Sequence, residues 1–145
     1  MFRGSAPARV DDKGRLKVPA AYLAELREFG DEFFVTSESP ERVRIFPMKV
    51  WNEIEKKAAE GSISNPAKQK FLTLTSYYGQ TATIDKQGRI LIHPRLREAA
   101  QMKGDVDVLG KQRFLEVWNH ARFEDHIARN LLTPEDLKAL DDLGI

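Results

Sequence analysis

The feature that most constrains this chain is an internal repeat, because one small unit used twice must build the fold from two similar halves. Residues Val10–Pro19 align with Ile84–His93 at an offset of 74, and Asp, Gly and Arg coincide between aliphatic residues in both segments. Gly30-Asp31 falls on Gly104-Asp105 at the same offset. The sequence therefore predicts two copies of one supersecondary unit.

The match extends beyond these segments with one change of spacing. Ile45-Phe46 falls on Val117-Trp118 at an offset of 72, so the first copy carries two extra residues, which we assign to the turn at 37–42. Insertions are tolerated in surface turns. Trp51 then falls on Phe123, and a helix-like stretch follows each. We interpret one unit as a hairpin, a short helix, a second hairpin and a longer helix.

The first hairpin of each copy has a recognisable turn. Lys13-Gly14 and Gln87-Gly88 lie between short stretches of alternating aliphatic residues, as expected for two strands joined by a turn. Gly14 and Gly88 are expected to take the positive φ that closes such a turn. Asp11 and Asp85 precede them and are expected to cap its free backbone N–H groups.

Proline and capping residues indicate where helices begin. Pro19–Leu26 and Pro94–Ala100 each open with a proline, which suits the first turn of a helix. Asn65-Pro66 is a cap followed by a first-turn proline, and Thr133–Asp136 resembles a capping box. An apolar stripe follows Pro66 and could be core or a subunit interface: Phe71, Leu74, Tyr77 and Tyr78. Antiparallel strands with helices indicate an α+β fold, not a helical bundle.

The unit boundaries follow from the repeat. We predict a first unit at 1–62, a linking helix at 63–80, a second unit at 81–130 and a terminal helix at 131–145. A unit of about 50 residues is too small to bury a sufficient core, so the two copies are expected to interleave. Aromatic residues recur at equivalent positions and are predicted to be core: Phe33, Phe34, Phe46, Trp51, Trp118 and Phe123.

Composition narrows the class of protein. With 41% apolar and 31% charged residues the chain is typical of a soluble globular protein, and without cysteine it has no disulfide or thiolate metal site. No stretch approaches the length needed to cross a bilayer, so we expect no membrane association. The net charge is only +1, yet residues 1–17 carry +3 and residues 131–145 carry −3, so one face could attract phosphate.

The doubled motif Asp-x-x-Gly-Arg-hydrophobic-x-hydrophobic, preceded by Met1-Phe2-Arg3-Gly4, resembles the MraZ family of bacterial transcription factors over nearly the whole chain. The resemblance implies two tandem AbrB-like units forming an intrachain swapped-hairpin, double-psi-like barrel with flanking helices. It also implies a ring-like homo-oligomer that binds short repeats in double-stranded DNA and represses its own cell-division and cell-wall gene cluster. Such a protein is cytoplasmic and nucleoid-associated and needs no cofactor.

The resemblance also assigns site residues. Arg15 and Arg89 correspond to the family's DNA-contacting arginines, and an arginine fork can bind a guanine edge in two places at once. Basic residues near the turns are candidates for phosphate contacts: Lys13, Lys17, Lys86, Arg3 and Arg9. His93 stands where the first copy has Pro19, so the helix-opening proline is shifted by one residue and the two halves are imperfect equivalents.

Other interpretations of the same residues exist. A single Asp-x-x-Gly-Arg turn occurs in unrelated hairpins, where the arginine forms a salt bridge with the neighbouring acid. An antitoxin-like module that grips DNA and a partner protein is the main alternative, although such proteins usually carry one copy and a long disordered tail. An enzyme is disfavoured because no nucleophile elbow, phosphate loop or metal-ligand set is present, and His93, His120 and His126 form no zinc pair. We therefore expect no small-molecule substrate.

Overall fold

A computed structural model describes all residues, 1–145. The predicted order of elements occurs twice in it. The first unit comprises β1 (Ser5–Val10), β2 (Arg15–Lys17), α1 (Ala20–Glu28), β3 (Glu32–Thr36), β4 (Val43–Pro47) and α2 (Met48–Ala59). The second comprises β5 (Gln80–Thr83), β6 (Arg89–Leu91), α4 (Pro94–Ala99), β7 (Gly104–Gly110), β8 (Leu115–Asn119) and α5 (His120–Arg129). Helix α3 (Pro66–Tyr78) links the units, and α6 (Pro134–Asp142) follows the second.

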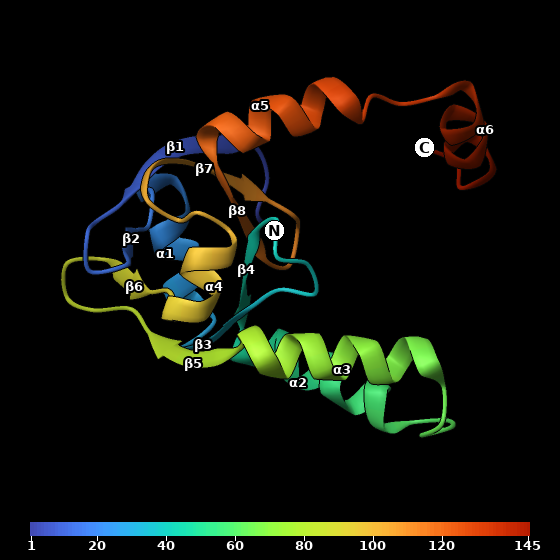
Figure 1. Cartoon of the computed structure of the whole chain (residues 1–145), viewed down its shortest axis with the longest axis horizontal. Helices are drawn as coiled ribbons and strands as arrows, with labels where there is room; N and C mark the ends of the chain where they lie inside the picture. Colours follow the sequence, from blue (N-terminus) through green and yellow to red (C-terminus); the bar gives the residue numbers. More distant parts are fainter.

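The eight strands form one antiparallel sheet in the order β5-β3-β4-β8-β7-β1-β2-β6. The turn between β5 and β6 joins the two edge strands, and the backbone N–H of Asp85 donates to the carbonyl of Arg89 at 2.9 Å. The sheet therefore curls into a nearly closed barrel, with α1 and α4 beside it and α2, α3 and α5 extending to one side (Figure 1).

Most strand pairs join one unit to the other. Strand β1 pairs with β7, β3 with β5, β4 with β8, and β2 with β6, where Leu16 lies opposite Ile90. These two residues are equivalent at the offset of 74, so the pair lies on an approximate two-fold axis. The expected interleaving is confirmed, because neither unit holds a complete barrel wall of its own.

The core is shared in the same way. Nineteen buried residues form one cluster that includes Leu16, Val35, Ile90 and Val108, and so draws on both units. Phe33 belongs to this cluster, and Phe46 and Trp51 belong to a smaller second one against which the half-buried Phe34 packs. Trp118 is buried as predicted, whereas Phe123 is half-buried. Burial of apolar side chains from both units makes the barrel a single cooperative structure.

A polar pair lies where the axis crosses β4 and β8. Arg44 is opposite Glu116, and Nε of Arg44 lies 3.0 Å from Oε2 of Glu116. Burial raises the pKa of Glu116, but hydrogen bonds from the Trp118 indole and from Arg44 outweigh it, so that pKa lies below its ordinary value. The two copies thus differ in charge at an equivalent position, and the difference becomes an ion pair between them.

The helix starts follow the predicted capping residues. Asn65 accepts a hydrogen bond from the Lys68 N–H, and Thr133 forms a capping box with Asp136. The shifted proline of the second copy does not shift the helix: α1 begins at Ala20 and α4 at Pro94, equivalent positions. His93 takes the N-cap position of Pro19, and its Nδ1 accepts from the Arg95 N–H at 3.1 Å. At the helix starts, therefore, the two copies are equivalent.

The apolar stripe on α3 has mixed surroundings. Phe71 stacks on Trp51 with ring centroids 6.2 Å apart, and Tyr78 packs against the barrel core. Tyr77 is exposed, and the Arg95 guanidinium lies over its ring. The two extra residues of the first copy lie in the predicted turn, because 37–42 joins β3 to β4 where 111–114 joins β7 to β8. No helix is long and apolar enough to cross a membrane.

Candidate nucleic-acid interface

The two Asp-x-x-Gly-Arg turns project from the same side of the barrel (Figure 1). They flank the short ribbon of β2 and β6, in which Arg15 lies opposite Leu91 and Lys17 opposite Arg89. Four residues of extended chain separate the Gly14 end of this ribbon from the Gly88 end, which corresponds to about 13 Å. Two turns that are 74 residues apart in sequence therefore form one surface.

Each turn is closed by its aspartate. Oδ1 of Asp11 accepts the N–H groups of Lys13 and Arg15, both at 2.9 Å. Oδ1 of Asp85 accepts the equivalent groups of Gln87 at 2.8 Å and Arg89 at 2.9 Å. These bonds favour the ionised carboxylate, so the pKa of each aspartate is lowered, chiefly by the N–H of Arg15 or Arg89.

The glycine of each turn forms a backbone hydrogen bond to the other copy. Gly14 and Gly88 have φ of +83° and +75°, the left-handed region that favours glycine. The Gly14 carbonyl accepts the N–H of Ile92, and the Gly88 carbonyl accepts that of Val18, each at 2.9 Å. Because each turn is bonded to the strand of the other copy, their spacing is fixed by the barrel.

The two arginines differ in how they are held. Nε of Arg15 donates to Oδ2 of Asp11 at 3.0 Å, which leaves the outer guanidinium nitrogens of Arg15 without a partner in the chain. The Arg89 side chain forms no hydrogen bond or ion pair at all. Both side chains are half-buried. Arg15 is therefore braced by its own turn, whereas the guanidinium of Arg89 is free to reorient.

Further basic residues surround a shallow depression beside the turns, with a volume of about 470 Å³. Five basic residues line it: Arg9, Arg15, Lys17, Arg89 and Lys103. The rest of the lining consists of two acids, one apolar residue and a glycine: Asp11, Asp12, Val10 and Gly104. The Lys17 amine donates to the carbonyl of Gln87, and Arg9 pairs with Asp105 at 2.6 Å. Open and strongly charged, this depression suits a polyanion better than a small apolar ligand.

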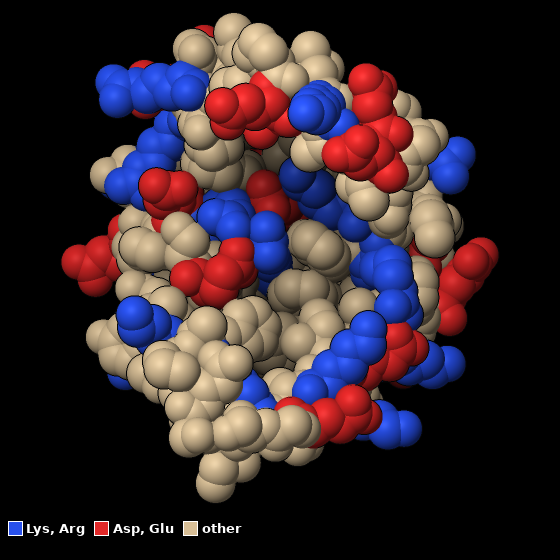
Figure 2. Space-filling model, turned by 90° about the vertical axis from the view of Figure 1, so that its right-hand side faces the viewer, with Lys and Arg blue, Asp and Glu red and all other residues tan.

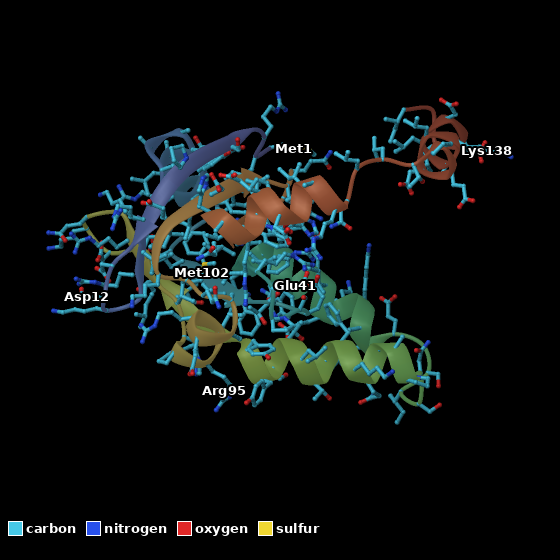
Figure 3. All side chains as sticks on the ribbon, turned by 45° about the horizontal axis from the view of Figure 1, so that its top comes forward. Met1, Asp12, Glu41, Arg95, Met102 and Lys138 are labelled. Atoms are coloured by element: carbon cyan, nitrogen blue, oxygen red, sulfur yellow. The ribbon has the colours of Figure 1, made fainter.

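The remaining predicted contacts are divided between two places. Lys13 and Lys86 lie exposed on the turns themselves. Arg3 lies at the opposite end of β1, next to the bridge between Phe2 and Gln112. The six residues of β1, about 20 Å of extended chain, separate Arg3 from the Asp11 turn. In Figure 3, Asp12 lies at the left edge of the molecule, whereas Met1 lies near the middle of the view.

Two basic residues at this surface were not identified from the sequence. Lys103 lines the depression. On α4, Nη1 of Arg97 donates to the Lys13 carbonyl at 2.8 Å and packs over Gly14. Leu23, the equivalent of Arg97, lies beside Gly88. The offset of 74 could have placed each helix residue on the other copy's turn, but only after the pairing of β2 with β6 was known.

The barrel and its paired turns define a protein built from two tandem AbrB-like units. A family model described as "MraZ protein, putative antitoxin-like" matches residues 1–74 and 79–141. A protein of Acidobacterium capsulatum named "Transcriptional regulator MraZ" is 46% identical over the full length of both chains. Relatives with the same name from Koribacter versatilis and Halothermothrix orenii are 45% and 31% identical, again over both full lengths. The chain belongs to the MraZ family.

Proposed function

We propose that this chain is a transcriptional regulator that binds double-stranded DNA through the paired turns. One observation carries the proposal: two arginine-bearing turns are bonded to each other's strands and present a single basic surface. Their separation of about 13 Å is comparable to the width of the major groove, about 12 Å. Membership of the MraZ family, whose relatives bear the name of transcriptional regulators, supports it.

Within this surface we assign different roles to the basic residues. Arg15 and Arg89 read base edges, because a guanidinium fork can bind O6 and N7 of guanine together. The other basic residues contact phosphates, which fix the register and contribute most of the salt-dependent affinity: Lys13, Lys17, Lys86, Arg9 and Lys103. Arg3 lies outside this surface and would not touch the same stretch of DNA. Function is binding without catalysis.

Several copies acting together would strengthen the binding. Each chain offers few phosphate contacts, so we propose that a ring-like homo-oligomer presents several turn pairs to successive DNA repeats and gains affinity by effective concentration. The target we propose is the region upstream of the chain's own cell-division and cell-wall gene cluster, bound as a repressor. This places the protein in the cytoplasm, beside the nucleoid.

Fluorescence anisotropy tests the proposal, with a labelled duplex from the upstream region and a shuffled duplex across a range of salt concentrations. We expect tight binding of the native duplex that weakens steeply with salt, and loss of most of it in Arg15→Ala. Arg113→Ala is the matched control, because Arg113 is exposed in the loop at the opposite end of the barrel. Equal and feeble binding of both duplexes, unchanged by Arg15→Ala, would contradict the proposal and favour the antitoxin-like alternative.

A further inference from the structure

Helix α6 stands apart from the rest of the chain (Figure 1). Its start is well capped, yet none of its residues is buried. Leu137 is 51% exposed, Leu140 is half-buried, and Leu143, just after the helix, is 73% exposed. Six of the ten exposed large apolar residues of the chain lie between Ile127 and Ile145. A helix of nine residues is marginal in water without tertiary packing. Helix α6 therefore requires packing against another surface to be stable.

The first unit shows what such a surface looks like. There α3 turns back and packs on α2, where Phe71 stacks on Trp51. In the second unit α5 is the counterpart of α2, and Phe123 packs on Trp118 as Trp51 packs on Phe46. No helix covers α5, so Phe123 remains half-buried and Ile127 is 48% exposed. An uncovered face and an unpacked helix thus occur in the same half of the chain.

The connection between α5 and α6 explains why the two do not pack within one chain. Residues 60–65 join α2 to α3 and include Gly61 at φ +75°, which helps the chain to reverse. Residues 130–133 join α5 to α6, are two residues shorter and contain no glycine. Short hinges of this kind favour exchange of an element between identical chains.

Charge also favours a second copy as the partner. Residues 131–145 carry one lysine and four acids, so they have a charge of −3, and residues 1–130 carry +4 of the chain's net +1. Figure 2 shows the side on which the helices project, hollowed in the middle, with Lys and Arg side chains in and around the hollow beside some Asp and Glu side chains. On α5, Arg122 and Arg129 line a depression together with Asp125 and Glu41, and Arg129 pairs with Asp125 at 3.1 Å. An acidic helix is therefore attracted to the body of another copy.

We propose that α6 of one copy packs on the α5 face of a second copy, around Phe123 and Ile127, in the place that α3 takes on α2 within each chain. This deepens the self-association part of the proposed function and does not depend on DNA binding. Because the donating helix and the receiving face are different surfaces, the contact is head-to-tail, and it closes into a ring when the rotation between copies permits.

Light scattering after size-exclusion chromatography tests this contact. Leu137→Gln with Leu140→Gln removes the apolar side of α6 and keeps a good helix former at both positions. We expect the mass of the assembly to fall at least twofold. Lys138→Gln is the matched control, since Lys138 lies about 160° around the helix from Leu140, and should leave the mass unchanged. A wild-type monomer, or a mass that the double variant does not change, overturns the proposal.

Disulfide cross-linking locates the contact, because the chain has no cysteine of its own and only the introduced cysteines can react. Ile127→Cys protein is mixed under oxidising conditions with Leu137→Cys protein carrying a tag of different size. We expect a disulfide-linked band of the combined mass, and little or none with Lys138→Cys in place of Leu137→Cys. No such band, or equal bands, overturns the contact. Binding of the same variants to a duplex with a single repeat is measured in parallel by anisotropy. If the variants lose assembly but still bind this duplex, the effect lies in the contact between copies and not in DNA binding by the turns.

Discussion

The two turns share a backbone but differ in their charges. In both, an aspartate caps two N–H groups, a glycine takes positive φ, and the carbonyl of that glycine is bonded to the other copy. Lys13 and Lys17 of the first turn correspond to Gln87 and Leu91 of the second, whereas Lys86 corresponds to Asp12. The features that shape the turn are thus the same in both copies, while the charged groups that a ligand would meet differ. The first turn is therefore expected to contribute more of the electrostatic attraction.

The arginines follow the same division. Arg15 is held by Asp11 at 3.0 Å, whereas Arg89 has no side-chain partner. An arginine held by an aspartate loses less conformational freedom on binding, but the aspartate partly neutralises its charge. An arginine without a partner loses more conformational freedom but offers its full charge to the DNA. Each turn is therefore expected to contribute to affinity, by a different route.

The largest effect is expected in the centre of the β2/β6 ribbon. Leu16→Ala and Ile90→Ala each remove a fully buried side chain at equivalent positions and should each lower the free energy of unfolding by about 2–5 kcal/mol. Urea denaturation should show two similar losses and a single transition for each variant. A large loss at one position with little at the other would break the equivalence of the two copies.

Glycine substitutions come next and should differ between the turns. Gly14→Ala and Gly88→Ala each force alanine into positive φ, at a cost of about 1–2 kcal/mol. A Cβ on Gly14 would also displace the end of the flexible Arg97 side chain and break its exposed bond to the Lys13 carbonyl, which adds a smaller cost. On Gly88 it would lie 3.0 Å from a methyl of Leu23. Thermal denaturation should rank Gly14→Ala as the more destabilised, and the reverse order would contradict this account of the turns.

Features set by neighbouring residues could be predicted from the sequence, whereas the contacts between residues far apart in the chain could not. Asp11, Gly14 and the proline at 66 act through neighbours a few residues away, so turn and helix starts could be predicted. The partner of β1 is β7, about 100 residues later, and no local pattern specifies which distant strand pairs with which. For the same reason the position of Arg97 of α4 on the first turn could not be predicted. Arg3 is a different case, because the length of β1 alone places it at the other end of that strand from the turn.

Salt dependence should separate the turns by a smaller effect. Lys13→Ala removes one phosphate contact and should reduce the slope of log affinity against log salt by about 0.9. Gln87→Ala, at the equivalent position of the second turn, is the matched control and should leave the slope unchanged. The measurement is anisotropy on the native duplex at several salt concentrations. Equal slopes for wild type and Lys13→Ala would remove Lys13 from the interface.

Acid sensitivity gives the smallest expected difference. The pKa values of Asp11 and Asp85 are lowered in the folded chain, so their contribution to stability is present above the ordinary aspartate pKa of about 3.9 and is lost as pH falls through the lower folded values. Asp11→Asn and Asp85→Asn should each flatten the fall in stability below about pH 4. Asp11→Asn should flatten it more, because Arg15 also donates its side-chain Nε to that carboxylate. Urea midpoints from pH 2.5 to 7 provide the test, and parallel curves for wild type and variants would argue against it.

The central claim is that both turns of one chain bind the same DNA, and a double-mutant comparison tests it most directly. Anisotropy on one native duplex at one salt concentration is measured for wild type, Arg15→Ala, Arg89→Ala and the double variant. Each single change should weaken binding about tenfold or more, which corresponds to the 1–3 kcal/mol of a bidentate base contact. The double variant should bind the native duplex no more tightly than the wild type binds the shuffled duplex. Wild-type affinity in Arg89→Ala, or in the double variant with its fold intact by circular dichroism, would contradict the paired-turn interface.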